Sequence, residues 1–289
     1  MATYVLDGVP LDHPGGCWRL KKGTKRRPLP GVRSVSVAVA GRAGDLPIMG
    51  LDHEATSFGL ALTVYSRTPD GDDGGFEQLE VNLEALGALL GVRHRLITCE
   101  WVAGSIVRVA GVTIEAVSEP EVNVGAALAR LTAVVKVPGV YWRDESVSTW
   151  TGALPGAEQI VTPLAGSTGP IVDSVLQVAG PAVNPSVTDV ATGGTVSYSG
   201  TVLDGDYLLI DCGNFTAAVV DTDTFDLAGG EDVTGDIDAT GPGSATRWLH
   251  LTPAMALGDP HSRAVLVSAT ASSTSGASGV KVRARRSYL

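Results

Sequence analysis

The amino-acid sequence predicts a mainly β protein of two domains, with one α-helix in the first. Short runs of β-branched or alternating apolar residues recur along the chain and are bounded by turn residues, as in sheet proteins. A single segment places its apolar residues at helical spacing. The chain has 289 residues, which suits two domains because an average domain has ~100 to 200.

The predicted helix lies in the middle of the first half. Leu79, Leu83, Leu86 and Leu90 recur every three or four residues and therefore line one face of a helix over 79–90. Gly91 then ends it, because glycine is favoured just beyond a helix. The strands predicted in this half cover residues 32–40, 60–66, 94–101, 105–109, 112–117 and 131–137.

A domain boundary is predicted where Gly, Pro, Ser and Thr accumulate. We expect a first domain over 1–150, a linker over 151–169 and a second domain over 170–289. The second domain shows no helical periodicity, and its short, evenly spaced strands favour an antiparallel sandwich. Its predicted strands cover residues 171–178, 195–199, 207–212, 215–220, 247–251, 264–269 and 280–286.

Charge is unevenly distributed between the two halves. Residues 1–150 carry 15 Lys and Arg against 17 Asp and Glu, a net charge of −2, whereas 151–289 carry 6 against 14, a net charge of −8. An acidic surface repels nucleic acid, so no direct nucleic-acid recognition is expected. The mean hydropathy is +0.19, but no apolar run approaches the ~18 residues that span a bilayer, so no membrane insertion is expected.

The start of the chain lacks the pattern of a secretory leader, and the protein is expected to be made in the cytosol. The three cysteines, Cys17, Cys99 and Cys212, are widely spaced and odd in number. They predict neither a disulfide framework nor a zinc module.

Motifs that carry catalysis are absent from the sequence, and no enzyme activity, catalytic residue or cofactor is predicted. There is no GxSxG, HExxH, P-loop or GxGxxG, and the histidines are scattered. A surface calcium site stays an alternative because several carboxylates cluster in the second half, although their spacing matches no known calcium loop. These are Asp221, Asp223, Asp232, Asp236 and Asp238.

Two basic segments are candidate assembly contacts. The first is followed by prolines and is expected to form an exposed loop, and the second alternates cations with Val280, Val282 and Ala284 as in a half-buried strand. If these cations meet an acidic neighbour, association should weaken with salt. The candidate residues are Arg19, Lys21, Lys22, Lys25, Arg26, Arg27, Lys281, Arg283 and Arg285.

Several segments together resemble the distal tail (Dit) proteins of long-tailed bacteriophages. In the first half these are the helix over 79–90 and the closing segment 137–144, which contains Tyr141 and Trp142. In the second half they are segments 175–185, 205–212 and 248–253. The resemblance covers almost the whole chain.

The resemblance implies a split-barrel-like first domain with one helix and a galectin-like antiparallel β-sandwich as the second. It implies a structural protein of the virion, assembled in the host cytoplasm and located at the distal end of the tail. The first domains would form a six-subunit ring on the tail tube protein, and hub or tail-tip proteins would dock on the other side.

The physics of a ring agrees with this implication. A closed ring of identical subunits pairs two different patches at each interface, and a nearly neutral first domain can associate with its copies at little electrostatic cost. The alternative is a carbohydrate-binding module or adhesin that reads host-surface glycans with its second domain. Its candidate contacts are Arg247, Trp248 and His250.

Overall fold

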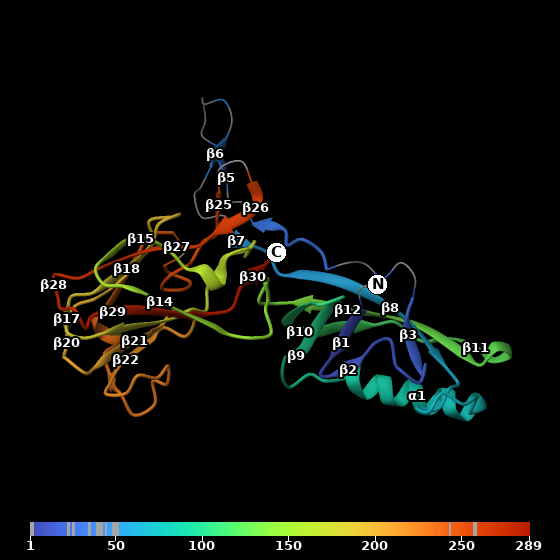
Figure 1. Cartoon of the computed structure of the whole chain (residues 1–289). Coiled ribbons are helices and arrows are strands. Elements are labelled where there is room, and N and C mark those ends of the chain that lie inside the picture. Colours follow the sequence, from blue (N-terminus) through green and yellow to red (C-terminus); the bar gives the residue numbers. More distant parts are fainter. Residues whose placement is uncertain are drawn as a thin grey trace. The chain divides into compact units, whose positions relative to one another are not determined.

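The chain forms two structural units, Met1–Glu145 together with Leu289, and Ser146–Tyr288. The computed structural model describes residues 3–21, 24, 27–33, 36–38, 43, 45–47, 52–242, 244–256 and 259–289. Both units are built mainly of antiparallel strands (Figure 1). The predicted fold class is confirmed.

The first unit contains one curled antiparallel sheet and, among its described residues, one α-helix, α1 (Gly75–Leu90). The central order of the sheet is β2-β1-β9-β10-β12-β8-β3. The strands of the unit are β1 (Thr3–Leu6), β2 (Val9–Pro10), β3 (Trp18–Leu20), β4 (Val32–Arg33), β5 (Ser36–Ala38), β6 (Asp45–Pro47), β7 (Asp52–His53), β8 (Thr56–Tyr65), β9 (Ile97–Ala103), β10 (Ile106–Val117), β11 (Glu121–Asn123), β12 (Leu128–Val137) and β13 (Trp142–Arg143).

Helix α1 lies on this sheet and contacts β8 and β12. Its predicted leucine face is confirmed: Leu79 and Leu86 are fully buried and Leu90 almost so, while Leu83 is half-buried. Asn82 fixes the helix to the end of β8, because its side-chain amide donates to the backbone oxygens of Tyr65 and Arg67, both at 2.8 Å. The helix starts four residues before the predicted range and is followed by Gly91 as predicted.

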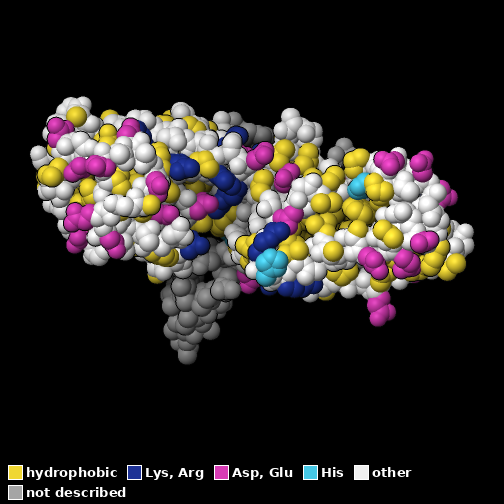
Figure 2. Space-filling view, turned by 90° about the horizontal axis from the view of Figure 1, so that it is seen from below, with side chains coloured by type: hydrophobic (Ala, Val, Ile, Leu, Met, Phe, Trp, Pro, Cys, Tyr) yellow, Lys and Arg dark blue, Asp and Glu magenta, His cyan; other side chains and the backbone are white. Residues whose placement is uncertain are grey.

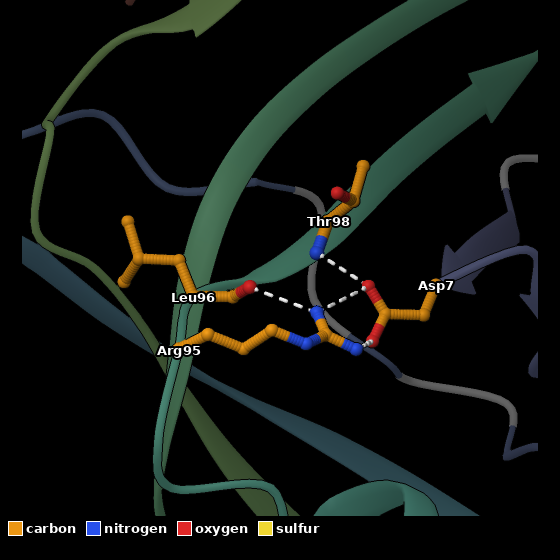
Figure 3. A network of polar contacts seen from close by, with 4 residues as sticks. All are labelled: Asp7, Arg95, Leu96 and Thr98. Carbon is orange, nitrogen blue, oxygen red and sulfur yellow. Dashed lines mark hydrogen bonds and ion pairs between the residues drawn. The ribbon is translucent and has the colours of Figure 1, made fainter.

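A polar network joins the β1–β2 hairpin to the start of β9 (Figure 3). Asp7 and Gly8, with φ of 47° and 79°, form the two-residue turn of the hairpin, where Asp-Gly is favoured because both residues take positive φ. The Asp7 carboxylate accepts from the Thr98 amide at 2.9 Å and from two guanidinium nitrogens of Arg95 at 2.6 and 3.2 Å. Asp7 therefore ties the hairpin turn to the segment that begins β9.

The second unit is a β-sandwich of two antiparallel sheets. One has the order β14-β29-β16-β21-β22-β23 and the other the order β15-β27-β18-β19-β24. The strands of the unit are β14 (Ser148–Ala153), β15 (Gly156–Ile160), β16 (Val175–Ala179), β17 (Ala182–Val183), β18 (Ser186–Asp189), β19 (Thr195–Tyr198), β20 (Thr201–Val202), β21 (Tyr207–Asp211), β22 (Thr216–Val220), β23 (Glu231–Asp232), β24 (Ile237–Thr240), β25 (Ala254–Ala256), β26 (Asp259–Ala264), β27 (Leu266–Thr270), β28 (Ser273–Thr274), β29 (Gly279–Ala284) and β30 (Ser287–Tyr288).

The inner faces of the two sheets share one apolar core. Strand β29 contributes Val280 and Val282, and β27 contributes Val267, each at most 1% exposed. The alternation predicted for the last segment is confirmed, because Lys281 and Arg283 lie on the opposite face of β29. No helix in the described part of the chain has the length and apolar character needed to cross a bilayer.

The structure differs from the sequence prediction at the start of the second unit. The linker predicted over 151–169 contains the end of β14 and all of β15, which pair with β29 and β27. The Trp150 side chain packs against the core and anchors β14 there. The sequence pattern does not show this, because the residues around Trp150 are mostly Gly, Ser and Thr.

Other strand predictions also need correction. The strand predicted over 247–251 is wrong, since within these described residues only Leu251 pairs, in an isolated bridge with Ile171. Leu249 and Leu251 are both buried although the segment forms no strand, and this burial produces the alternating pattern. The strands predicted over 105–109 and 112–117 are one strand, β10, which continues through Gly111 and carries a register shift between Ile114 and Ala116. The strand predicted over 32–40 lies partly outside the described residues.

Candidate assembly surfaces

The first basic segment begins in the edge strand β3, at Arg19, and continues beyond its end. Lys22, Lys25 and Arg26 lie outside the described residues. Arg19 and Lys21 are exposed, and the backbone holds them in place because the Lys21 amide donates to the Ala61 oxygen at 2.7 Å. These two cations are therefore presented to solvent at the border of the sheet.

Arg27 has a different role from its neighbours. Its guanidinium carbon lies 5.3 Å from the ring centroid of Trp101 in β9, a cation–π distance. Arg27 thus packs within its own unit and is less suited to an assembly contact than Arg19 or Lys21.

The second basic cluster lies on the outer face of β29 and just beyond its end. Lys281 Nζ is 2.5 Å from Asp223 Oδ1, and this contact holds the pKa of the Asp223 carboxyl below its usual range. The Arg283 guanidinium carbon lies 5.5 Å from the centroid of the Phe225 ring. Both cations are therefore engaged by one segment of their own unit.

Arg283 and Arg285 also line a surface cavity of about 250 Å³ together with Val147, Asp173 and Val175. The lining contains two arginines against one aspartate, so its net charge is positive, and with two valines beside them it suits an acidic side chain with an aliphatic stem, because arginine binds carboxylates through paired hydrogen bonds. Of the second cluster, Arg283 and Arg285 are thus the residues with room for an external anionic group.

The carboxylates considered for calcium are engaged separately rather than together. Asp223 binds Lys281, and the Asp232 carboxylate accepts from the Thr234 amide at 2.9 Å. Within the described residues, no three or more His, Cys, Asp or Glu side chains are grouped as a metal site requires.

The residues of the glycan alternative occupy an irregular segment beside the core. Trp248 packs edge-on against Phe215 with ring centroids 5.7 Å apart and also against the apolar core. His250 is half-buried, and Arg247 donates to the backbone oxygen of Thr246 at 3.2 Å. Trp248 is therefore a packing residue first, and glycan recognition by these residues stays a prediction.

The sequence prediction did not single out the exposed apolar side chains of the first unit. Figure 2 shows hydrophobic side chains beside carboxylates on this unit, at the right of the view. On α1, Phe76 and Val81 are 45% and 50% exposed and lie outside the leucine face. The signal was present in the sequence as apolar residues at helix positions that the leucine periodicity does not use. Exposed large apolar residues elsewhere in the unit are Leu29, Val32, Leu96, Ile106, Val117, Val122 and Val124.

Comparisons with known proteins establish the fold. No protein-family model and no curated protein matches the chain. The Dit protein of phage SPP1, described as a paradigm of the hub adsorption apparatus in phages that infect Gram-positive bacteria, is similar in structure with a TM-score of 0.62 and 13% identity, over 100% of both chains. Two structures of the phage P2 baseplate in its activated conformation, with Ca and with Sr, match at 10% identity over 98% of each chain, with TM-scores of 0.40 and 0.39. The resemblance predicted from the sequence is confirmed for the fold by the SPP1 likeness.

Proposed function

We propose that this chain is a structural protein of a bacteriophage virion, located at the distal end of the tail, where it joins the tail tube to hub or tip proteins. The observation that carries this proposal is the likeness to SPP1 Dit, which extends over the full length of both chains. A likeness of both units in one order supports a shared architectural role better than a likeness of one widespread domain would. The proposal assigns the chain no catalytic activity and no cofactor.

The proposed assembly is a six-subunit ring joined through the first units. Of the exposed large apolar side chains in the described chain, nine belong to the first unit, and only Val147, Ile160 and Leu203 belong to the second. Exposed apolar surface marks sites of association, and the near-neutral charge of the first half removes the repulsion that the acidic half would cause. Head-to-tail contact between two different patches of this unit would close a ring.

The acidic second units are proposed to lie away from the ring axis and to remain available for other tail proteins. Their cavity beside Arg283 and Arg285 is the proposed contact for an acidic side chain of a neighbour. Because exposed ion pairs are screened by salt, this contact would contribute most at low ionic strength.

A matched pair of surface variants tests the ring contact. Val81→Glu places a charge on the exposed apolar part of α1, and Leu203→Glu makes the same change at a 62% exposed position of the second unit. We expect the purified chain to form a closed oligomer that Val81→Glu disrupts and Leu203→Glu leaves intact, measured by native mass and negative-stain images. Equal behaviour of the two variants would contradict assembly through this surface.

A further inference from the structure

Part of the outer face of the six-stranded sheet in the second unit is covered, although no second sheet of the described residues packs there. Leu208 and Ile210 of β21 point into the sandwich core, so Leu209 points outward, yet it is fully buried. On the neighbouring strand β22, Ala218 and Val220 also point outward and are 5% and 7% exposed. These three residues form an apolar patch that solvent does not reach.

The cover is the segment that connects β22 to β23, residues 221–230, which we call the strap; it follows β22 in orange in Figure 1. Its last residue, Gly230, lies directly on the patch, because a Cβ atom there would be 2.7 Å from a methyl carbon of Val220 and 3.0 Å from the Ala218 Cβ. Phe225 and Leu227 of the strap are half-buried. The strap therefore replaces the layer that would otherwise cover this face.

Side chains of the sheet hold the strap in place at three consecutive positions. The Lys281 ammonium binds Asp223, the Gln177 amide nitrogen donates to the Thr224 backbone oxygen at 2.8 Å, and Arg283 lies over the ring of Phe225. Gln177 is paired across neighbouring strands with Leu209 on one side and Lys281 on the other. Two of the three contacts therefore come from residues in the same cross-strand row as Leu209 of the apolar patch.

No backbone–backbone hydrogen bond of this described segment ties the strap to the sheet. Within this fully described region, the backbone hydrogen bonds of the strap stay inside it, from the Thr224 amide to the Thr222 oxygen at 2.8 Å and from the Gly230 amide to the Leu227 oxygen at 3.2 Å. A segment without ladder bonds can separate while the sheet beneath stays intact, because proteins open locally where few backbone bonds and contacts must break.

We propose that the strap is a latched cover that opens without unfolding the sandwich, held closed by the Lys281–Asp223 ion pair and its two neighbouring contacts. Closed, it keeps ligands and partner proteins from the sheet face; open, it exposes the apolar patch of Leu209, Ala218 and Val220. The ion pair is the part of the latch that salt weakens, since the side chains of Lys281 and Asp223 are 26% and 50% exposed.

Thiol labelling of the full chain tests this proposal. Leu209→Cys places a thiol beneath the strap, and cysteine is smaller than leucine, so it does not push the strap away. The native Cys212 is the internal control, because it is fully buried in the core of the same sandwich and reacts only when the sandwich opens. We expect Cys at position 209 to react at least about tenfold faster than Cys212, as local opening costs less than unfolding.

Two charge variants in the Leu209→Cys background then isolate the latch. Asp223→Asn removes the ion pair, and we expect about a fivefold faster reaction at position 209 with Cys212 unchanged, the size of effect that an exposed pair supports. Asp221→Asn removes the same charge from the strap at a side chain outside the three contacts, and no change is expected. High salt should accelerate the reaction in the parent and leave the Asp223→Asn variant unaffected.

Three outcomes would overturn the proposal. Reaction at position 209 no faster than at Cys212 would show that the strap does not open separately. Equal rates in the two charge variants would show that the ion pair is not a latch. Should Leu209→Cys fail to fold, Ala218→Cys places a thiol at another position of the patch, and a thiol there that reacts no faster than Cys212 would contradict local opening.

Discussion

The sheets of the two units are covered to different extents. The difference indicates which unit has apolar surface for contact with other copies of the chain. In the second unit a sheet covers one face of the six-stranded sheet and the strap covers apolar residues on the other. In the first unit α1 covers part of the curled sheet, and large apolar side chains such as Val81 and Val124 remain 50% and 72% exposed. Apolar surface left open in an otherwise well-packed unit is the surface that a partner would cover.

The net charges of the two halves also favour association through the first unit. The first half is nearly neutral, whereas the second half carries a net charge of −8 and uses part of its few cations to hold its own strap. Copies can therefore approach through the first unit at the lowest electrostatic cost. Five stability predictions test how independent and how different the two units are.

The largest expected effects come from matched core truncations. Leu62 and Leu208 are fully buried in the first and second unit respectively. Truncation of either to Ala should lower the stability of its own unit by about 2 to 5 kcal/mol, through lost burial and the cavity that remains. Hydrogen exchange measured on peptides from each unit shows whether the loss of stability is confined to the truncated unit. Equal loss of protection in both units from either variant would show one shared core instead of two.

The next effect concerns a buried carboxylate of the second unit. Asp189 accepts from the Thr192 amide and hydroxyl at 3.2 and 2.7 Å and from the Thr252 amide at 3.1 Å. Asp189→Ala leaves these partly buried donors without an acceptor and should cost about 3 kcal/mol in denaturant unfolding of the second unit. A loss as small as that of a surface substitution would show that the carboxylate is not needed there.

The same group has a pH dependence of definite sign. Burial raises the pKa of the Asp189 carboxyl despite its hydrogen bonds, so the folded unit holds this proton more tightly than the unfolded chain does. Its contribution to stability is therefore complete below the unfolded pKa and falls as the pH rises through the folded pKa. Asp189→Asn should remove this dependence.

A smaller effect of opposite direction is expected on α1. Gly87 lies in the helix, is exposed, and a Cβ atom there would meet nothing within 4 Å. Gly87→Ala should stabilise the first unit by about 0.5 to 1 kcal/mol, because alanine loses less backbone freedom in a helix. Thermal unfolding of the variant measures this change in stability. A decrease would mean that the added methyl group meets other atoms and that the space beside Gly87 is not open.

The smallest effect is expected at Asp7. Its hydrogen bonds with Arg95 hold the pKa of the carboxyl below its usual range. The carboxylate therefore contributes stability that is present above the unfolded pKa and is lost as the pH falls through the folded pKa, the reverse of Asp189. Asp7→Asn should remove the acid sensitivity from exchange of the β1–β2 hairpin. If hydrogen exchange of the hairpin keeps the same pH dependence in the variant, Asp7 is not the source of that dependence.

Much of this architecture could be predicted from local sequence. The spacing of the leucines in α1 and the alternation in β29 follow directly from which residues are buried, and both predictions are confirmed. Strands β14 and β15 were missed because their burial comes from Trp150 and from neighbours distant in sequence. Lys281 and Arg283 were correctly placed on the polar face, but their partners Asp223 and Phe225 are some 60 residues away, and only folding brings them together.

The native mass of the full-length chain, measured from low to high salt with images of the same sample, tests the central claim most directly. We expect a closed ring of six copies whose contacts map to the first unit, so that Val81→Glu reduces it to monomers. A monomer at every concentration and salt, or a ring that Leu203→Glu breaks and Val81→Glu does not, would contradict it.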